Sequence, residues 1–395
     1  MSMEKFCEKN SIDRLGTNSL KWDALDKRYG DKDLIAMWVA DMEFKTPEVV
    51  IAAMEKRIKH GIFGYSYVPD SYYDSFIKWE KDEHNYEVNK EWMRFSTGVV
   101  TALYWLVNAF TNLSDSVIII TPVYYPFHNA VNDNGRKLIT SELINTKGVY
   151  TIDFENFEKS IIENHVKLFI QCSPHNPVGR VWTEEEELDK VLSICKRHNV
   201  LVVSDEIHQD IIIGENKQLP AAIVSGARYA DNLITVTSAS KTFNLAGLLN
   251  CNIIISNEEI RAKYDAYAKT VNKTEVNIMG LTATEAAYNH GRKWLDSLLD
   301  VILYNYNHVK NRLSEETPKI IITPLEGTYL AWLDLRGYIN PNDTKTFIQD
   351  KCRLAVDFGE LFSEECKGFV RLNMATNPKY VEKAVDNIIK NINCL

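Results

Sequence analysis

A single lysine stands in a stretch of small and hydroxyl residues, "SASKTFNLAG" at 238–247. The run before it, "NLITVT" at 232–237, predicts a buried strand, so Lys241 is expected at the end of that strand. An amine removed from water loses its proton readily and can then form a Schiff base with an aldehyde. The hydroxyls of Ser238 and Ser240 can donate hydrogen bonds to an anion. The segment therefore indicates an aldehyde that carries a phosphate, although an isolated lysine here would by default extend its ammonium into water.

Two other polar segments that follow predicted strands supply what such a molecule needs. Pyridoxal phosphate is an aldehyde of this kind, and its pyridine nitrogen needs a carboxylate partner to stay protonated. Asp205, at the end of "VLVVSD", is placed for that role. Asn176 in "HNPVG" is the first choice as a donor to the 3-oxygen of the ring. Taken singly, Asp205 is typical of a turn or cap, and the Asn-Pro-x-Gly pattern of a plain tight turn.

The phosphate group needs further donors, and one more segment offers them. "RFSTGVVTALYWLV" at 94–107 passes from a short extended stretch through Gly98 into a helical pattern. The amides of Val99 and Val100 are then expected at a helix N-terminus, where main-chain N–H groups bind anions. A glycine that opens a helix is common, so this segment has weight only together with the others.

The elements that must position these residues follow an α/β pattern. Short apolar runs, rich in β-branched residues and separated by helical patterns, predict parallel strands buried on both faces; they are 116–120, 166–172, 199–205, 232–237 and 250–255. A helix is predicted at 183–199, opened by a capping box of Thr183 and Glu186. The three polar segments should open onto the same side of the sheet, because ligands collect beyond the carboxyl ends of parallel strands.

The rest of the chain predicts a second, smaller unit. Residues 258–315 are expected to be mostly helical, and "KIIITP", "GTYLAWLDL" and "GFVRLNMA" suggest α+β structure after them. We expect an N-terminal segment at 1–48 that joins the small domain, a large cofactor-binding domain at 49–288 and a small C-terminal domain at 289–395. No linker rich in Pro, Gly or Ser separates these parts.

Composition limits the possible functions. A net charge of −9 argues against a nucleic-acid partner, which would require clustered Lys and Arg. The chain has no apolar run of 18 residues and begins with the polar "MSMEKFCEKN", so no membrane span or signal peptide is expected. Its seven cysteines form no C-x-x-C, which suggests neither a disulfide framework nor a metal site. A reduced, cytoplasmic protein that uses no metal is the prediction.

"SPHNPVGR", "VSDEIH" and "SASKTFNLAG", in this order, resemble fold-type-I pyridoxal phosphate (PLP) enzymes of the aminotransferase superfamily. "MWVADMEFKTP", "FGYSYVPD", "GTYLAWLDLR" and "GFVRLN" further resemble its MalY/PatB group of cystathionine β-lyases, also called C–S lyases. The resemblance covers nearly the whole chain. It implies the PLP-dependent transferase fold, with a mostly parallel, helix-flanked sheet in the large domain, and a small amino-acid substrate.

The resemblance also implies the remaining roles. Arg371 would hold the α-carboxylate of the substrate by a two-pronged contact, and the main chain of Ala40 would lie along the substrate. Tyr124 would stack on the pyridine ring, with Tyr125 as a near competitor. Tyr65 would reach the phosphate of the cofactor in a neighbouring subunit, which implies a homodimer with shared active sites.

Two departures from the general aminotransferase pattern resemble the C–S lyase branch. Leu249 stands where many members have an arginine, and His208 where many have a tyrosine. His208 either faces the oxygen of the cofactor or packs under it. The expected reaction is β-elimination from cystathionine or related cysteine thioethers, with an aminotransferase as the alternative because both reactions use the same residues. A PLP-binding regulatory or interaction protein is a further alternative.

Overall fold

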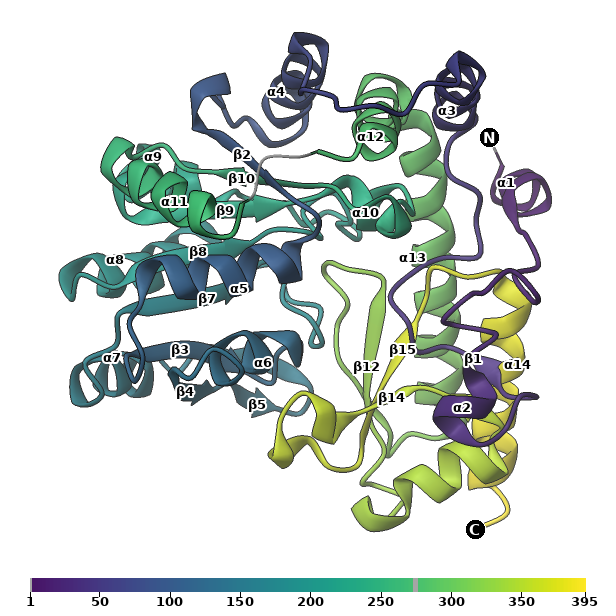
Figure 1. Ribbon diagram of the computed structural model, residues 1–395. Helices are drawn as coiled ribbons and strands as arrows, with labels where there is room; N and C mark the ends of the chain where they lie inside the picture. The colour runs from purple at the N-terminus through teal and green to yellow at the C-terminus, as the bar shows by residue number, and fades with distance from the viewer. Residues whose placement is uncertain (1, 273–275) are drawn as a thin grey trace.

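The computed structural model describes residues 2–272 and 276–395. The larger part of the molecule, on the left in Figure 1, is built on a mixed sheet of seven strands. In spatial order these strands are β2 (Met93–Ser96), β10 (Cys251–Ile254), β9 (Leu233–Thr237), β8 (Leu201–Asp205), β7 (Leu168–Cys172), β3 (Ser116–Thr121) and β4 (Lys137–Glu142). The five strands from β9 to β4 run parallel. The α/β fold class expected from the sequence is therefore confirmed.

The predicted direction of one strand was wrong. The apolar run at 250–255 was expected to be parallel, but β10 lies antiparallel to both β9 and β2. The connection between β9 and β10, residues 238–250, stays at one end of the sheet, whereas a parallel pair requires a long crossover to the other end. That connection holds the segment of Lys241. A strand buried on both faces has the same apolar pattern in either direction.

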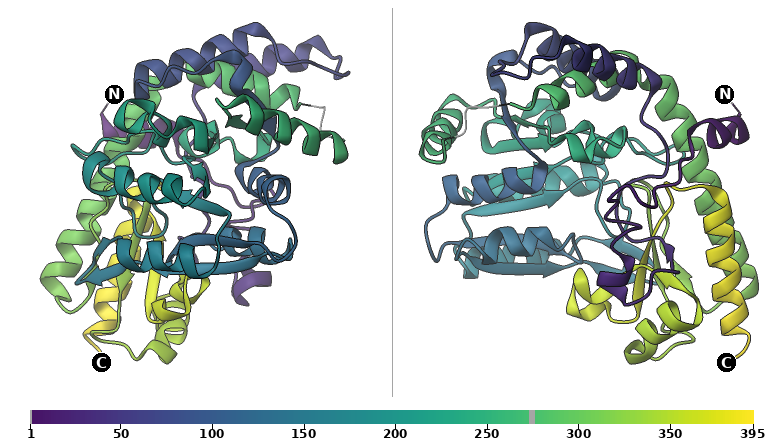
Figure 2. Two further views of the ribbon diagram at one scale, coloured as in Figure 1. Left: turned by 90° about the vertical axis from the view of Figure 1, so that its left-hand side faces the viewer. Right: turned by 45° about the vertical axis from the view of Figure 1, so that its right-hand side comes forward.

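Both faces of the large sheet are covered by helices, as β3 illustrates. Val117 and Ile119 belong to one hydrophobic cluster, with residues of α5 (Val99–Phe110), α6 (Pro126–Asn132) and α11 (Glu258–Thr270). Ile118 and Ile120 belong to a second cluster, on the face covered by α7 (Phe154–Glu163) and α8 (Asp189–Arg197) (Figure 2). Buried side chains therefore alternate between the two faces, as in a sheet that lies between two helical layers.

The helix predicted at 183–199 does not begin with the expected capping box of Thr183 and Glu186. Glu184–Leu188 form a π-helical turn, and α8 follows it. The amide and the hydroxyl of Thr183 both donate to Glu187 Oε2, at 2.9 and 3.1 Å, so Glu187 takes the place expected for Glu186. The wider π turn changes which carboxylate faces the N-terminus. Arg180 also donates to the Glu187 carboxylate.

A second sheet forms the smaller part of the molecule. Its antiparallel strands are, in order, β11 (Ile321–Ile322), β12 (Leu330–Asp334), β15 (Phe369–Asn373) and β14 (Asp357–Phe358). The long helix α13 (Arg292–Glu316) packs along α14 (Pro378–Ile392) beside it (Figure 2). The N-terminal segment joins this part, because β1 (Ile35–Ala36) pairs with β13 (Leu354–Ala355). The exact domain boundaries stay a prediction.

The remaining elements surround these two sheets. They are α1 (Met3–Asn10), α2 (Leu25–Tyr29), α3 (Glu48–His60), α4 (Asp70–His84), α9 (Val224–Ala227), α10 (Ala239–Thr242), α12 (Ile278–His290) and the hairpin β5 (Ile144–Thr146) and β6 (Val149–Thr151). The predicted helical character of 258–315 appears as α11, α12 and α13. None of the helices in the described ranges is long and apolar enough to span a membrane.

Candidate active site

Lys241 lies in the one-turn helix α10 that follows β9. The Ser238 hydroxyl caps this helix by accepting from the Ser240 amide at 3.1 Å, and it donates to the Asn250 carbonyl at 2.6 Å. The Lys241 amine donates to the main-chain oxygen of Ala40 at 2.7 Å. Burial lowers the pKa of this amine to about 8, although nearby carboxylates favour its charged form. Lys241 therefore faces the interior, where its amine gives up a proton more easily than in water.

The loop after β8 carries Asp205 and His208. Asp205 pairs in register with Cys172 of β7 and Val236 of β9, so the segments after these three strands leave the same edge of the sheet. Burial raises the pKa of Asp205 to about 7, against one hydrogen bond of 3.1 Å from the Ile207 amide. Such a carboxylate is poised to accept a cationic N–H partner.

The His208 ring is buried and packs edge-on against the ring of Tyr329, with centroids 5.7 Å apart. Burial and the nearby cations hold the pKa of His208 well below its ordinary value, so the imidazole is neutral. Its Nδ1 has no hydrogen-bond partner among the described residues. An unpaired buried nitrogen beside the site is suited to a ligand atom. Whether it faces the cofactor stays a prediction.

The "SPHNPVGR" turn brings Asn176 beside Tyr124 and Arg371. The Asn176 carbonyl accepts from the Tyr124 amide at 3.1 Å, and its Oδ1 accepts from Arg371 Nη1 at 2.9 Å. Tyr124 is partly buried and lies against Tyr125, with ring centroids 5.2 Å apart. Three predicted residues from separate segments thus meet at one place.

Arg371 is the third residue of β15 and is only 2% exposed. Its Nη2 donates to the Trp38 carbonyl at 3.2 Å and to the carboxylate of Asp357, its cross-strand partner. The guanidinium carbon lies 4.9 Å from the centroid of the Phe362 ring. Its Nε has no partner among the described residues. A buried guanidinium that is oriented by several acceptors, with a donor still available, is suited to hold a carboxylate.

The sequence interpretation missed Tyr329, whose hydroxyl donates to Ala40 O at 2.7 Å. One main-chain oxygen thus receives both a lysine and a tyrosine donor. It also missed Asn373, whose Nδ2 donates to the carbonyls of Val39 and Asp41 at 2.6 and 2.7 Å. Tyr329 and Asn373 both lie in segments that carry the family resemblance, but no spacing rule distinguishes them from packing residues.

The residues predicted to hold the phosphate lie in three separate segments: the start of α5, the helix α10 with its cap, and the stretch between α3 and α4. Val99 and Val100 are the first residues of α5, so their amides have no partner within the helix. Ser240 is partly exposed, whereas the Ser238 hydroxyl already bonds the main chain. Tyr65 is 98% exposed, in the extended segment between α3 and α4. Its side chain is therefore available to a second molecule.

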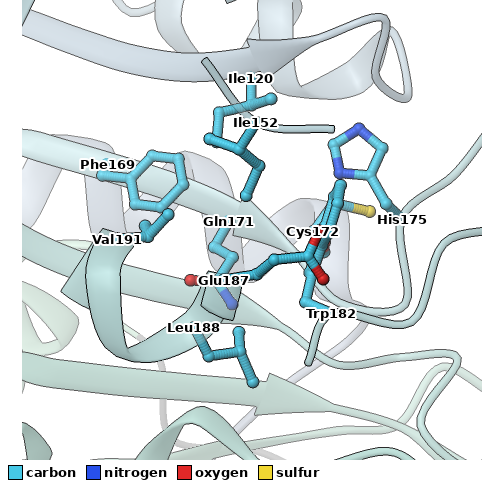
Figure 3. A pocket seen from close by; sticks show the side chains of 10 residues that line it. All are labelled: Ile120, Ile152, Phe169, Gln171, Cys172, His175, Trp182, Glu187, Leu188 and Val191. Carbon is cyan, nitrogen blue, oxygen red and sulfur yellow. The ribbon is translucent and has the colours of Figure 1, made fainter. Parts of the chain in front are cut away.

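A small cavity of about 10 Å³ lies behind the "SPHNPVGR" turn (Figure 3). Its lining includes His175, Trp182 and Gln171 but none of the predicted site residues. His175 Nε2 is 2.9 Å from the Pro122 carbonyl, and burial lowers the pKa of His175 to about 4. This cavity has room for about one water molecule. His175 therefore packs the back of the turn. In the described ranges, no group of three His, Cys, Asp or Glu could hold a metal ion.

The fold and the site define a class of enzyme, one in which a lysine at the carboxyl edge of a mixed α/β sheet faces an arginine from a second sheet. The chain belongs to the aminotransferase class I and II family, whose model matches residues 32–388. The resemblance inferred from the sequence motifs is thereby confirmed at the level of the family.

Three relatives narrow the comparison. PatB of Bacillus subtilis (strain 168), named a cystathionine beta-lyase, is 40% identical over 91% of this chain and 93% of its own. Protein MalY of Escherichia coli (strain K12) is 31% identical over 96% of this chain and 97% of its own. A solved structure of a PLP-bound C–S lyase from Staphylococcus hominis is similar with a TM-score of 0.89 and 36% identity, covering 96% of each chain. The likeness thus extends over essentially the whole length of all three.

Proposed function

We propose that this protein is a PLP-dependent carbon–sulfur β-lyase that cleaves L-cystathionine or related cysteine thioethers to pyruvate, ammonia and a thiol. One observation carries the proposal: Lys241 and Arg371 bond to main-chain carbonyls two residues apart, those of Ala40 and Trp38. Residues this close have Cα atoms at most about 7 Å apart. The Lys241 amine and the Arg371 guanidinium are thus bound to neighbouring positions of one segment. This arrangement suits an α-amino acid, in which the α-carbon that loses a proton is bonded directly to the carboxylate. The similarity to cystathionine beta-lyase PatB supports the choice of reaction.

The residues present fit pyridoxal phosphate. Asp205 is a buried carboxylate, and a protonated pyridine nitrogen would satisfy it. We assign Asn176 to the 3-oxygen and Tyr124 to the ring face. The phosphate would be held by Ser240 and the amides of Val99 and Val100, with Tyr65 of a second subunit. Ser238 would join them by turning its hydroxyl from the Asn250 carbonyl to the phosphate. When bound, this cofactor supplies an electron sink for the carbon that loses a proton.

Each residue then has a task that its position allows. Arg371 holds the α-carboxylate, and Asn176 orients the guanidinium through its Oδ1. Lys241 Nζ, whose pKa is lowered to about 8 by burial, removes the proton from the α-carbon. The electron pair left at that carbon then forms a double bond to the β-carbon and expels the thiolate, which takes up a proton. Water hydrolyses the released 2-aminoacrylate to pyruvate and ammonia. The main chain of Ala40 lies along the substrate and keeps the amine within reach.

We propose a homodimer in the cytoplasm. Tyr65 belongs to an exposed apolar group with Ile62, Phe63 and Tyr67, and a second copy of the chain would cover it. The cysteines of the described ranges are free and all but one are buried, as expected in a reducing compartment.

The test is incubation of the protein with L-cystathionine, without any 2-oxo acid, followed by assays of pyruvate and thiol. A lyase forms both in equal amounts. The family name gives a specific reason to test a second function, aminotransfer. Conversion of amino acids only after a 2-oxo acid is added would establish the aminotransferase and exclude the lyase. Lys241→Ala should abolish either activity, whereas Lys217→Ala, a change in an exposed loop, should abolish neither.

A further inference from the structure

A buried carboxylate that the proposed reaction does not use lies close to Lys241. The Asp210 side chain is 4% exposed and lies two residues beyond His208 on the loop after β8. Its Oδ2 accepts from the Thr242 hydroxyl at 2.6 Å. Thr242 follows Lys241 directly and is fully buried. A single hydrogen bond thus joins the loop of Asp205 to the helix that carries the lysine.

The other oxygen of this carboxylate is bound from a third element. Asp210 Oδ1 accepts from Trp79 Nε1 at 3.0 Å and lies 2.7 Å from His84 Nε2, and both partners belong to α4. Burial would raise the pKa of Asp210, but the bonds from His84 and Thr242 outweigh it and hold that pKa below its ordinary value. An ionised, fully bonded carboxylate in a buried place makes strong and directional contacts.

A second contact fixes the same loop to α4. Gln209 Nε2 donates to Glu80 Oε1 at 2.7 Å. Within the loop, the Gln209 amide donates to the Glu206 carbonyl and the Ile211 amide to the His208 carbonyl, both at 2.9 Å. The loop is therefore held on both sides of Asp210, and α4 serves as its support.

The helix α10 needs such an anchor. It comprises four residues, and a single helical turn does not hold its shape without tertiary contacts. Its start is capped by Ser238, whereas Thr242, at its end, is tied by its side chain to Asp210. The Lys241 side chain leaves the helix between these two fixed points.

We propose that Asp210 is a positioning residue, which sets the place of the Lys241 amine relative to Asp205 and His208 by holding the Thr242 hydroxyl. The bond from Thr242 carries this effect, and Trp79 and His84 keep the carboxylate in place. A test of this role by lyase turnover rests on the proposed function. A test by the chemical reactivity of the Lys241 amine in cofactor-free protein does not.

The experiment uses the full chain with Thr242→Val, which keeps the shape of the side chain and removes only the hydroxyl. Thr242→Ser restores the hydroxyl, and Asp210→Asn removes the charge. Thr235→Val is the matched control, because the Thr235 hydroxyl is also buried but has no partner among the described residues. In cofactor-free protein, trace acetylation at pH 8 measures the reactivity of Lys241 against exposed Lys27, with mass spectrometry as the readout.

In Thr242→Val we expect Lys241 labelling to fall about threefold relative to Lys27, because a released amine is hydrated and regains its proton. With the cofactor bound, kcat for cystathionine should fall about tenfold or more with little change in KM, since misplacing a reacting group affects the chemical step. Thr242→Ser and Thr235→Val should match the wild type, and Asp210→Asn should resemble Thr242→Val.

Two outcomes would overturn the proposal. One is a Thr242→Val protein that unfolds at a lower temperature but keeps wild-type labelling and kcat, because the hydroxyl would then be merely structural. The other is equal losses in Thr235→Val. If Asp210→Asn does not fold, the comparison of Thr242→Val with Thr242→Ser still tests whether the Thr242 hydroxyl positions Lys241. Suppose that the wild type lacks lyase activity, but that Lys241 is still labelled less in Thr242→Val than in the wild type. This result would refute the proposed function and leave the role of Asp210 standing.

Discussion

Replacing Arg371 by lysine tests the assignment of the substrate carboxylate most directly. Arg371 is buried and already bonds Asn176, Trp38 and Asp357 through its two terminal nitrogens. Lysine keeps the positive charge, so the electrostatic balance with Asp357 survives. It loses the planar fork, however, and an ammonium group cannot occupy the positions of both terminal nitrogens at once.

The magnitude follows from the bonds that are lost. A hydrogen bond to a charged group contributes about 1.5–3 kcal/mol. Losing one such bond to the substrate carboxylate should therefore lower kcat/KM about 10- to 150-fold, since about 1.4 kcal/mol corresponds to a factor of ten. Asn176, which accepts from Nη1, also loses its partner, so the effect should lie toward the upper end of that range. The Lys241 and Asp205 contacts are unchanged, so the yellow colour of the bound cofactor should remain.

The assay measures pyruvate from L-cystathionine at several substrate concentrations, together with the visible absorbance of the protein. Arg336→Lys is the matched control. Arg336 forms a fork with Asp334 at 2.8 and 2.7 Å, but its side chain is 43% exposed and it is not a predicted site residue. Unchanged kcat/KM in Arg371→Lys would refute the carboxylate assignment. An equal loss in Arg336→Lys would show that the effect arises from general destabilisation of the smaller sheet.

Three further predictions use other parts of the molecule. Borohydride should fix the cofactor to the peptide that contains Lys241, and peptide mapping that finds the label on another lysine would contradict the central assignment. A Tyr65→Phe subunit mixed with a Lys241→Ala subunit should regain one normal site per mixed dimer, because both lesions then fall on the same composite site; no gain of pyruvate formation despite proven subunit exchange would exclude shared sites. His84→Gln should reduce the free energy of unfolding by about 3 kcal/mol at pH 6. Burial opposes protonation of His84, but Asp210 raises its pKa to about 9, so in denaturant titrations the difference from wild type should shrink as the pH rises through that value; a difference independent of pH would mean that the imidazole is not charged.

Much of the large sheet could be predicted from the sequence because its strands are buried on both faces. Such strands form short apolar runs, and polar residues follow them where the chain emerges at the edge. Lys241, Asp205 and Asn176 were proposed as site residues in this way, because each stands at the end of such a run or four residues beyond it. The direction of β10 was not predictable, since the apolar pattern of a doubly buried strand does not depend on the direction of its neighbours.

The parts of the site that the sequence did not reveal depend on contacts between distant residues. Tyr329 bonds to Ala40 across 289 positions, and Asp357 meets Arg371 only because β14 and β15 pair. Asp210 was missed for the same reason, since its hydrogen-bond partners come from α4 and α10. A single aspartate or tyrosine in a sequence carries no sign of such a partner. Only the packing of the elements determines it.

The segment from Trp38 to Phe44 is part of a recognisable sequence motif, although it contacts the candidate site residues mainly through its main chain. Its main-chain carbonyls accept hydrogen bonds from side chains of β15, of the residue before β12 and of the connection between β9 and β10. The pairs are Arg371 on Trp38, Asn373 on Val39 and Asp41, Lys241 and Tyr329 on Ala40, and Asn244 on Met42 and Phe44. Two of these donors, Lys241 and Arg371, are the residues assigned to the substrate. The segment therefore sets the distance between them, and a change in its backbone would move both together. A side chain such as that of Ala40 can be small because the carbonyl, not the side chain, makes the contacts.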